Sequence, residues 1–419
     1  MARDDYGKLA RTRWSIGQVL MPAHFQADEE ALSQETWLRS GLGGPPSYGV
    51  AELVWDAAQL EKGSLAIGLL LLIAPDGKLV AVPGNATVSD LDLKASGARR
   101  VTVYLHVRRE ARGARGLKLY ERDPPELERV VQEAVLAASE SLDNARLVMK
   151  LGDFQKGVDG AWQLDPAYVP PLVRVGPNPF LQSVLTELRQ FLRQAGDELS
   201  RQLLDGFSGG ETRALVRRCQ IEAAHLEALL GDLGNGIYVH PYVLFQALRR
   251  FYIEVCFLAG LAPESQTERY DHDDLAGTFD RLGSAIAHHL RYRPELSPHR
   301  EFVRQAEVYT AASLDDPVLK AAEVYLLLQK SSPEERISLD GVKLASPLRL
   351  PTVHARALTG IPFEPVPFPT FRHSFGPEVD FYRLLPGAEW EYVRRERALA
   401  FYYRRELGQA RPALFWREG

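Results

Sequence analysis

The sequence predicts an α+β protein built from three domains: an N-terminal β-sandwich, a central four-helix bundle and a small C-terminal α/β domain. The length of 419 residues corresponds to about three domains of ~150 residues each. Apolar residues recur at every second position in the first part of the chain and at every third or fourth position in the middle part. Prolines are frequent in the last part of the chain. We therefore expect domains at 1–175, 176–298 and 299–419.

The first domain is predicted to be mostly β. In the segment Val101–Arg108, apolar residues alternate with polar ones, as in a strand with one buried face. The tripeptide Pro75-Asp76-Gly77 separates two apolar runs and predicts a tight turn. One helix is expected near 126–142. Short strands at this spacing are typical of a sandwich.

The second domain is predicted to be helical. Leucines and other apolar residues between Leu181 and Leu203 fall on one face over more than six turns of helix. The segment Phe207–Gly210 is expected to break this helix. A third helix is expected to begin at His240-Pro241, because proline is tolerated at the first helical position, and a fourth near Asp274. Four helices with short connections predict an antiparallel bundle.

The third domain is predicted to be mixed. Seven prolines lie between Pro347 and Pro377, too many for a helix or a central strand. Strands are expected at 308–312, 322–328, 399–403 and 413–416. Large rings are concentrated near the C-terminus, where they serve either as core or as anchors of a partner interface. The candidate partner-binding rings are Phe381, Tyr382, Trp390, Tyr402 and Tyr403.

Composition narrows the functional class. Hydrophobic residues make up 45% and charged residues 25% of the chain, as in ordinary globular proteins. The net charge of −5 gives no basic excess for nucleic-acid binding. No apolar run approaches the ~20 residues of a membrane helix, so no membrane insertion is expected. The polar N-terminus and only two cysteines predict a cytoplasmic protein.

The strongest enzyme-like cluster consists of Asp271, His272 and Asp274. Carboxylates beside an imidazole can hold a divalent metal, so a metal-dependent hydrolase is one alternative. The simpler interpretation is that these acids cap the fourth helix and complement its dipole. Nucleotide-binding, zinc-protease and serine-hydrolase motifs are absent from the sequence. We predict no catalytic, cofactor-binding or metal-binding residue and no enzymatic activity.

The segment 14–28 carries a more specific signal. It resembles the opening signature of the TssK family, the baseplate subunits of bacterial type VI secretion systems, with alanine at position 23 in place of the usual glutamine. Further matches follow in order, at 162–171, 270–279 and 342–382. The residues that match the opening signature are Trp14, Gly17, Leu20, Pro22, His24, Phe25, Gln26 and Asp28.

The resemblance implies a β shell similar to the shoulder of phage receptor-binding proteins, a helical neck and a C-terminal head, assembled as a homotrimer. It implies that the N-terminal part binds the TssF–TssG wedge. It also implies that the head contacts the cytoplasmic parts of the TssJ–TssL–TssM membrane complex, chiefly TssL and TssM. The chain would then be a non-enzymatic adaptor without cofactors, at the inner face of the inner membrane. A subunit of a related phage-like contractile machine is the nearer alternative.

Within this resemblance, the opening motif has two interpretations. Its residues Trp14, Gly17, Leu20, Pro22, His24, Phe25 and Gln26 either form the wedge-docking surface or fold onto the shell domain and cover its edge. The apolar members offer the contact area that either role requires.

Overall fold

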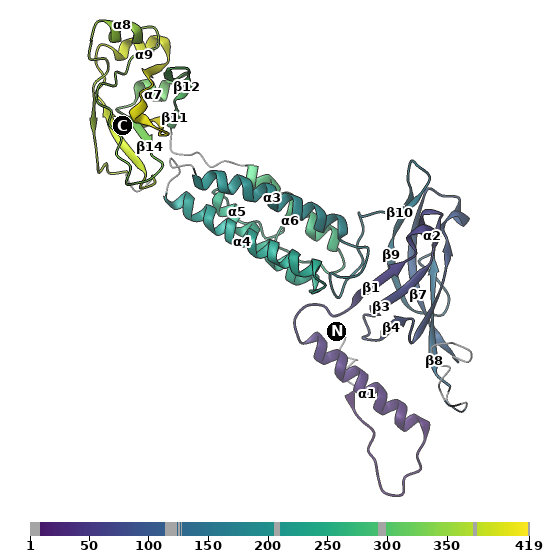
Figure 1. Ribbon diagram of the computed structural model, residues 1–419. Coiled ribbons are helices and arrows are strands. Elements are labelled where there is room, and N and C mark those ends of the chain that lie inside the picture. The colour runs from purple at the N-terminus through teal and green to yellow at the C-terminus, as the bar shows by residue number, and fades with distance from the viewer. Residues whose placement is uncertain are drawn as a thin grey trace. The chain divides into compact units, whose positions relative to one another are not determined.

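The computed structural model describes residues 9–113, 124, 126, 128–204, 210–291, 299–371 and 375–417 (Figure 1). The chain divides into two compact units. The first contains residues 1–193, 222–253 and 263–287, and the second contains 194–221, 254–262 and 288–419. Several sheets and helices make up the described residues, which is an α+β fold.

The first unit holds a long N-terminal helix and three antiparallel or mixed sheets. A three-stranded sheet has the order β1-β3-β4, a five-stranded sheet has the order β10-β9-β7-β8-β5, and β2 pairs with β6. The elements are α1 (Pro22–Gly41), β1 (Gly49–Trp55), α2 (Ala57–Glu61), β2 (Ser64–Leu65), β3 (Ile67–Ile73), β4 (Leu79–Val82), β5 (Ala86–Ser89), β6 (Leu91–Asp92), β7 (Arg100–Gly113), β8 (Val130–Ala137), β9 (Ala145–Lys156) and β10 (Trp162–Leu164).

The two larger sheets contact each other through aromatic rings. Trp55 of β1 lies edge-on to Phe154 of β9, with ring centroids 5.6 Å apart. The predicted alternation in β7 is confirmed, because Val101, Val103 and the two apolar residues that follow at the same period are all buried. Part of the core of this unit therefore lies between the inner faces of the two sheets.

The turn predicted at Pro75-Asp76-Gly77 is confirmed, since it joins β3 to β4. Gly77 has a φ of +81°, which favours glycine, and a Cβ at this position would lie only 2.5 Å from the ring of Trp37. The helix expected near 126–142 is wrong. Val130–Ala137 form strand β8, because its backbone pairs with both β7 and β5. Tertiary pairing overrides the local helical preference of this segment.

One edge of the three-stranded sheet is closed by a side chain. Strand β4 pairs with β3 on one side only. On its other side, Asn85 Oδ1 accepts a hydrogen bond from the Ala81 amide at 2.8 Å. The Asn85 Nδ2 group donates to the Leu79 carbonyl, also at 2.8 Å. The carbonyl of Leu79 and the amide of Ala81 are thereby satisfied within the chain.

Four long helices follow, each with a buried apolar stripe: α3 (Gln182–Leu204), α4 (Gly210–Gly234), α5 (Pro241–Leu258) and α6 (Leu275–Arg291). The starts predicted at Pro241 and just after Asp274 are confirmed. The expected break at 207–210 lies mostly outside the described residues, and α4 begins at Gly210. Within the first unit, the guanidinium of Arg189 on α3 donates to the Leu230 carbonyl of α4 at 3.2 Å. None of the described helices is long and apolar enough to cross a membrane.

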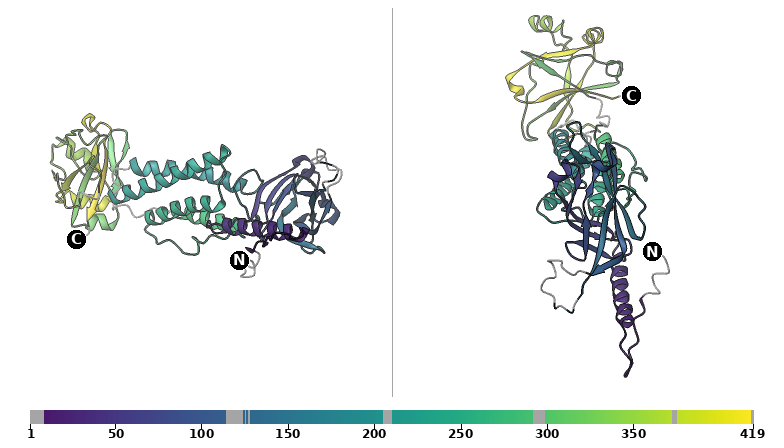
Figure 2. Two further views of the ribbon diagram at one scale, coloured as in Figure 1. Left: turned by 90° about the horizontal axis from the view of Figure 1, so that it is seen from below. Right: turned by 90° about the vertical axis from the view of Figure 1, so that its right-hand side faces the viewer.

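The second unit contains the remaining sheets. Their orders are β11-β18-β14-β16-β15 and β12-β13-β17. The strands of this C-terminal part are coloured green to yellow in Figure 2. The elements are β11 (His299–Glu301), β12 (Val303–Gln305), β13 (Val308–Ala311), α7 (Asp316–Lys320), β14 (Glu323–Gln329), α8 (Leu350–Ala355), β15 (Phe363–Pro365), β16 (Val379–Leu384), α9 (Trp390–Glu396), β17 (Leu399–Tyr402) and β18 (Arg411–Arg417). All four strands predicted here are confirmed to within two residues.

The expectation of an α/β arrangement for the C-terminal part is wrong. Every strand pair in the described residues of this part is antiparallel, and the helices are short. Strand β14 is central and buried on both faces. Val324 and Leu326 point into one hydrophobic cluster, and Tyr325 and Leu327 point into another. This double burial explains why its sequence is continuously apolar.

Candidate functional site

The opening motif forms a compact cap on the first turns of α1. Proline at position 22 occupies the first helical position, as its fixed φ favours. The indole of Trp14 lies 5.6 Å from the ring of His24 and 5.7 Å from that of Phe25. Its Nε1 donates to Asp28 Oδ2 at 3.2 Å. The segment before the helix therefore folds back onto α1.

Asp28 and His24 fix this cap. The Thr12 amide donates to Asp28 Oδ1 at 2.7 Å, and this backbone hydrogen bond lowers the pKa of the carboxyl. His24 Nδ1 accepts from the Met21 amide at 3.2 Å, which satisfies one of the free donors at the helix start. Gly17, with a φ of +83°, supplies the turn that brings Trp14 back to the helix.

The apolar side chains of the motif remain exposed. Trp14 is 45% exposed, Leu20 63% and Phe25 55%, and Ile16 and Val19 are even more open. Gln26 is exposed as well. Of the residues of α1, only Ala31 is buried. The motif thus presents several apolar side chains that the described part of the chain does not cover.

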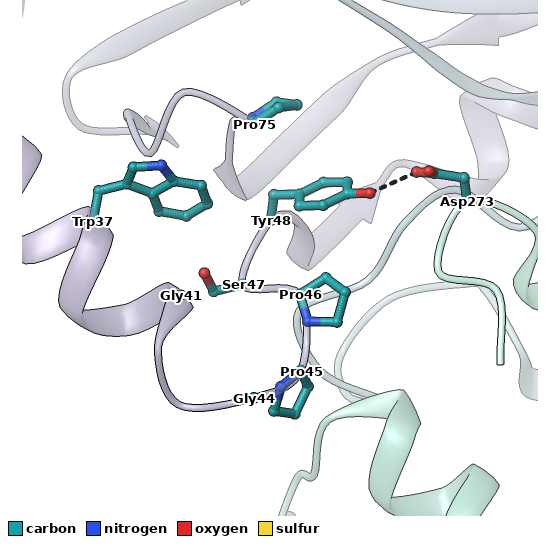
Figure 3. Close-up of a pocket in the computed structure, with 9 residues that line it drawn as sticks. All are labelled: Trp37, Gly41, Gly44, Pro45, Pro46, Ser47, Tyr48, Pro75 and Asp273. Carbon is teal, nitrogen blue, oxygen red and sulfur yellow. Dashed lines mark hydrogen bonds between the residues drawn. The ribbon is translucent and has the colours of Figure 1, made fainter. Parts of the chain in front are cut away.

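The C-terminal half of α1 is attached to the first sheet. The ring of Trp37 packs on the Pro75-Asp76-Gly77 turn, as the close approach to Gly77 shows. From Gly41 the chain continues through Pro45 and Pro46 to Tyr48, where β1 begins one residue later (Figure 3). This segment, residues 42–48, is called the α1–β1 connection.

Two histidines fasten the α1–β1 connection to the helices. His240, which immediately precedes α5, bonds through Nε2 to the Pro46 carbonyl at 2.8 Å. His272, which lies before α6, bonds through Nε2 to the Tyr48 carbonyl at 2.9 Å. The two imidazole rings stack, with centroids 5.4 Å apart and an interplanar angle of 14°. Pairs of residues about 190 to 230 positions apart in sequence are thereby held together. The contacts of His240 with Pro46, of His272 with Tyr48 and of the two imidazole rings with each other are called the junction.

The hydrogen bonds of His240 require its ring to be neutral, and those of His272 are compatible with a neutral ring. Each Nε2 must carry hydrogen in order to donate to a carbonyl. His240 Nδ1 accepts from the Tyr242 amide at 3.0 Å, and His272 Nδ1 lies 2.9 Å from the Tyr270 hydroxyl, which can donate to it. Burial lowers the pKa of both histidines, against the raising effect of their carbonyl partners.

The residues Asp271, His272 and Asp274 do not converge on a metal site. Both ring nitrogens of His272 are engaged in the junction. Asp271 Oδ1 accepts from the Asp273 amide at 3.0 Å, and Asp274 Oδ1 accepts from the Gly277 amide at 3.0 Å, which caps α6. Among the described residues, no group of three metal-ligating side chains is found. The capping interpretation therefore agrees with the observed geometry.

The C-terminal aromatic residues separate into two groups. Phe381 and Trp390 are only 3% exposed, and each lies inside a hydrophobic cluster. The expectation that these two rings contact a partner is wrong, because they fill the core of their own unit. Tyr382, Tyr402 and Tyr403 are half-buried. The most exposed ring of this unit is Phe368, which is 90% exposed and was not singled out from the sequence.

Sequence reasoning also missed Trp37, Tyr48 and His240 as parts of one site. The only local signals are the Pro45-Pro46 pair and the proline after His240, and neither indicates a contact with a distant segment. Tyr48 donates its hydroxyl to Asp273 Oδ1 at 2.8 Å. Burial, together with this hydrogen bond, raises the pKa of Tyr48 to about 12.

The junction is expected to weaken in acid. Because the pKa of both histidines lies below the ordinary 6.5 in the folded chain, the unfolded chain binds more protons as the pH falls below 6.5. The stabilisation is complete above 6.5 and decreases as the pH falls toward the folded pKa. The nearby carboxylates of Asp271 and Asp273 oppose the shift of His272 without reversing it.

Urea unfolding between pH 7 and pH 5 measures this dependence. The variant His240→Asn with His272→Gln retains side-chain hydrogen-bonding groups but does not titrate in this range. Its stability is expected to fall less steeply with acidification than that of the unchanged chain. Parallel curves for the two proteins would contradict the role given to the junction.

Several known proteins are similar to this chain. The type VI secretion system baseplate component TssK1 of Pseudomonas aeruginosa is 26% identical, covering 94% of this chain and 95% of that protein. A crystal structure of TssK is 18% identical with a TM-score of 0.54, covering 98% of this chain and all of that one. A chain of the baseplate complex from the type VI secretion system is 19% identical with a TM-score of 0.58, at the same coverage.

A third solved structure, the TssK-TssF-TssG baseplate subcomplex, is 20% identical with a TM-score of 0.53, covering 67% of this chain and 99% of that one. At such identities these structures establish the likeness of fold. A family model described as bacterial type VI secretion, EvfL, ImpJ, VasE matches residues 24–135 and 120–416. Because this match takes in most of the sequence, the chain belongs to the TssK family of bacterial type VI secretion, whose members include ImpJ and VasE.

Proposed function

We propose that this chain is a trimeric, non-enzymatic adaptor of a type VI secretion baseplate. Its N-terminal β-rich shell domain, residues 1–175, binds the TssF–TssG wedge. Residues 176–298 form a helical neck, and the head, residues 299–419, binds the cytoplasmic parts of TssL and TssM. Support comes from the names of similar proteins, a baseplate component and a TssK-TssF-TssG subcomplex. In this role the protein acts in the cytoplasm, at the inner face of the inner membrane.

The uncovered apolar surface of the opening motif carries the proposal. The rings of Trp14 and Phe25 pack against each other in a defined cap, yet Trp14, Leu20 and Phe25 each keep about half or more of their surface exposed. Packing of Trp14 on α1 rather than on a strand argues against a motif that only seals the shell. A surface of this kind gains free energy when a partner covers it.

The motif is tested by Leu20→Asp with Phe25→Asp. Both side chains are exposed, so the fold is expected to persist, whereas burying two new carboxylates in an interface is strongly unfavourable. Capture of TssF–TssG by the purified variant is expected to fall by about a hundredfold or more.

The matched control is Leu42→Asp, which changes a leucine that is even more exposed than Leu20 and lies just after α1, outside the motif. It is expected to capture the wedge normally. If the double variant also captured TssF–TssG normally, or if both variants lost capture equally, the motif would not be the docking surface.

The head is tested by ending the chain at residue 298. The residues after this point contain complete sheets, and the hydrophobic clusters between them consist of residues after 298 alone. The shortened chain is expected to keep a mass near three times that of its protomer and to capture TssF–TssG. It is expected to lose capture of TssL and TssM.

Retained wedge capture is the internal control that the shortened chain is folded. If the shortened chain still captured TssF–TssG and also captured TssL or TssM as well as the full chain, the head would not be the part that binds the membrane complex. A monomeric full-length protein in solution would remove the trimer.

A further inference from the structure

The pocket beside the α1–β1 connection has the composition of a cation-binding site. It has a volume of about 580 Å³ and is lined by residues from α1, the α1–β1 connection, the β3–β4 turn and the segment before α6 (Figure 3). Trp37 and Tyr48 supply aromatic rings, and Pro45, Pro46 and Pro75 supply apolar surface. A volume of this size lies in the range of ordinary ligand pockets.

The aromatic walls are held in place before any ligand arrives. Trp37 rests on the turn at Gly77, where no side chain larger than hydrogen fits. Tyr48 is fixed at three points: its carbonyl bonds to His272, its hydroxyl bonds to Asp273, and its ring lies edge-on to the His272 imidazole at 4.8 Å. Because these walls are already ordered, ligand binding loses little free energy to side-chain conformational entropy.

The charge of the pocket is negative. Asp273 supplies the only carboxylate among the described residues that line it, and no lysine or arginine is among them. The carboxylate is exposed to solvent, and Tyr48 uses its Oδ1. No hydrogen bond to its Oδ2 is found among the described residues, so this oxygen is available to a donor.

From this arrangement we infer that the pocket binds an arginine side chain on an extended segment of a partner protein. A planar guanidinium stacks on aromatic faces and donates to a carboxylate at the same time, which a lysine ammonium does less well. The prolines offer apolar contact to the residues that flank the arginine. This inference does not depend on the adaptor role.

The test uses the full chain labelled with 5-fluorotryptophan, and the fluorine resonance of Trp37 is assigned among the six tryptophans with Trp37→Phe. The probes are Nα-acetyl-arginine amide and the corresponding citrulline amide, which has nearly the same shape without the charge. The arginine probe is expected to shift the Trp37 resonance and to bind about tenfold or more tightly than the citrulline probe.

Two variants complete the test. Asp273→Asn keeps an acceptor for Tyr48 but removes the charge, and it is expected to weaken the arginine probe by about tenfold. Asp274→Asn removes the same charge from the neighbouring position, outside the pocket lining, and is expected to leave binding unchanged. Equal binding of the two probes, equal loss in the two variants, or a Trp37 resonance that does not move would each overturn the inference.

Discussion

Phe401→Ala is expected to lower the free energy of unfolding of the second unit by about 3 to 5 kcal/mol. Phe401 is fully buried on β17, where its ring centroid lies 5.1 Å from that of Phe302 and 5.2 Å from that of Tyr309. Truncation removes the ring from the largest hydrophobic cluster of this unit and leaves a cavity that the paired strands cannot fill.

Urea unfolding of the full chain, with hydrogen exchange followed at the amides of β13 and β17, measures this effect. The matched control is Phe368→Ala, which removes the same ring from a position that is 90% exposed. It is expected to change stability by no more than about 0.5 kcal/mol. Similar losses for the two variants would show that Phe401 does not anchor this core.

Gly49→Ala is expected to destabilise the first unit by about 3 kcal/mol, from backbone strain and a lost hydrogen bond together. Gly49 has a φ of +120°, and a Cβ there would lie 2.3 Å from the Pro171 carbonyl oxygen. That oxygen accepts the Val50 amide at 2.8 Å, so relieving the clash breaks the hydrogen bond. Tyr48, one residue earlier, would shift with it.

The control variant Gly97→Ala separates the backbone strain of Gly49→Ala from the loss of its hydrogen bond. Gly97 also has a positive φ, +65°, but a Cβ there would meet nothing within 4 Å. Its replacement therefore reports backbone strain alone, at about 1 kcal/mol. Chemical denaturation of both variants gives the comparison, and equal losses would mean that the approach of Pro171 is not a constraint.

The features of this fold that could be predicted from the sequence are those that neighbouring residues determine locally. Proline at 241 marked the start of α5, and Pro75-Asp76-Gly77 marked the turn between β3 and β4, because proline fixes φ and glycine accepts a positive φ. The segment that became β8 was misjudged because its strand character depends on pairing with β5 and β7, which no local pattern encodes.

Only part of the candidate site could be predicted from the sequence, for the same reason. The opening motif could be recognised because its residues lie together at 14–28 and match a family signature. The junction of Tyr48 with His240 and His272 joins segments that are distant in sequence. The aromatic residues near the C-terminus illustrate a further limit: composition alone did not distinguish the buried Phe381 from the exposed Phe368.

The hydrogen bonds of the Asn85 side chain protect an edge strand from aggregation when many copies of the protein are close together. By occupying the Ala81 amide and the Leu79 carbonyl, it blocks two of the backbone groups of β4 that another extended chain would need for strand pairing. Many copies of such a protein can accumulate side by side while this border of the sheet resists fibrous aggregation. Recognition is then left to side chains, which discriminate between partners, rather than to bare peptide groups, which do not.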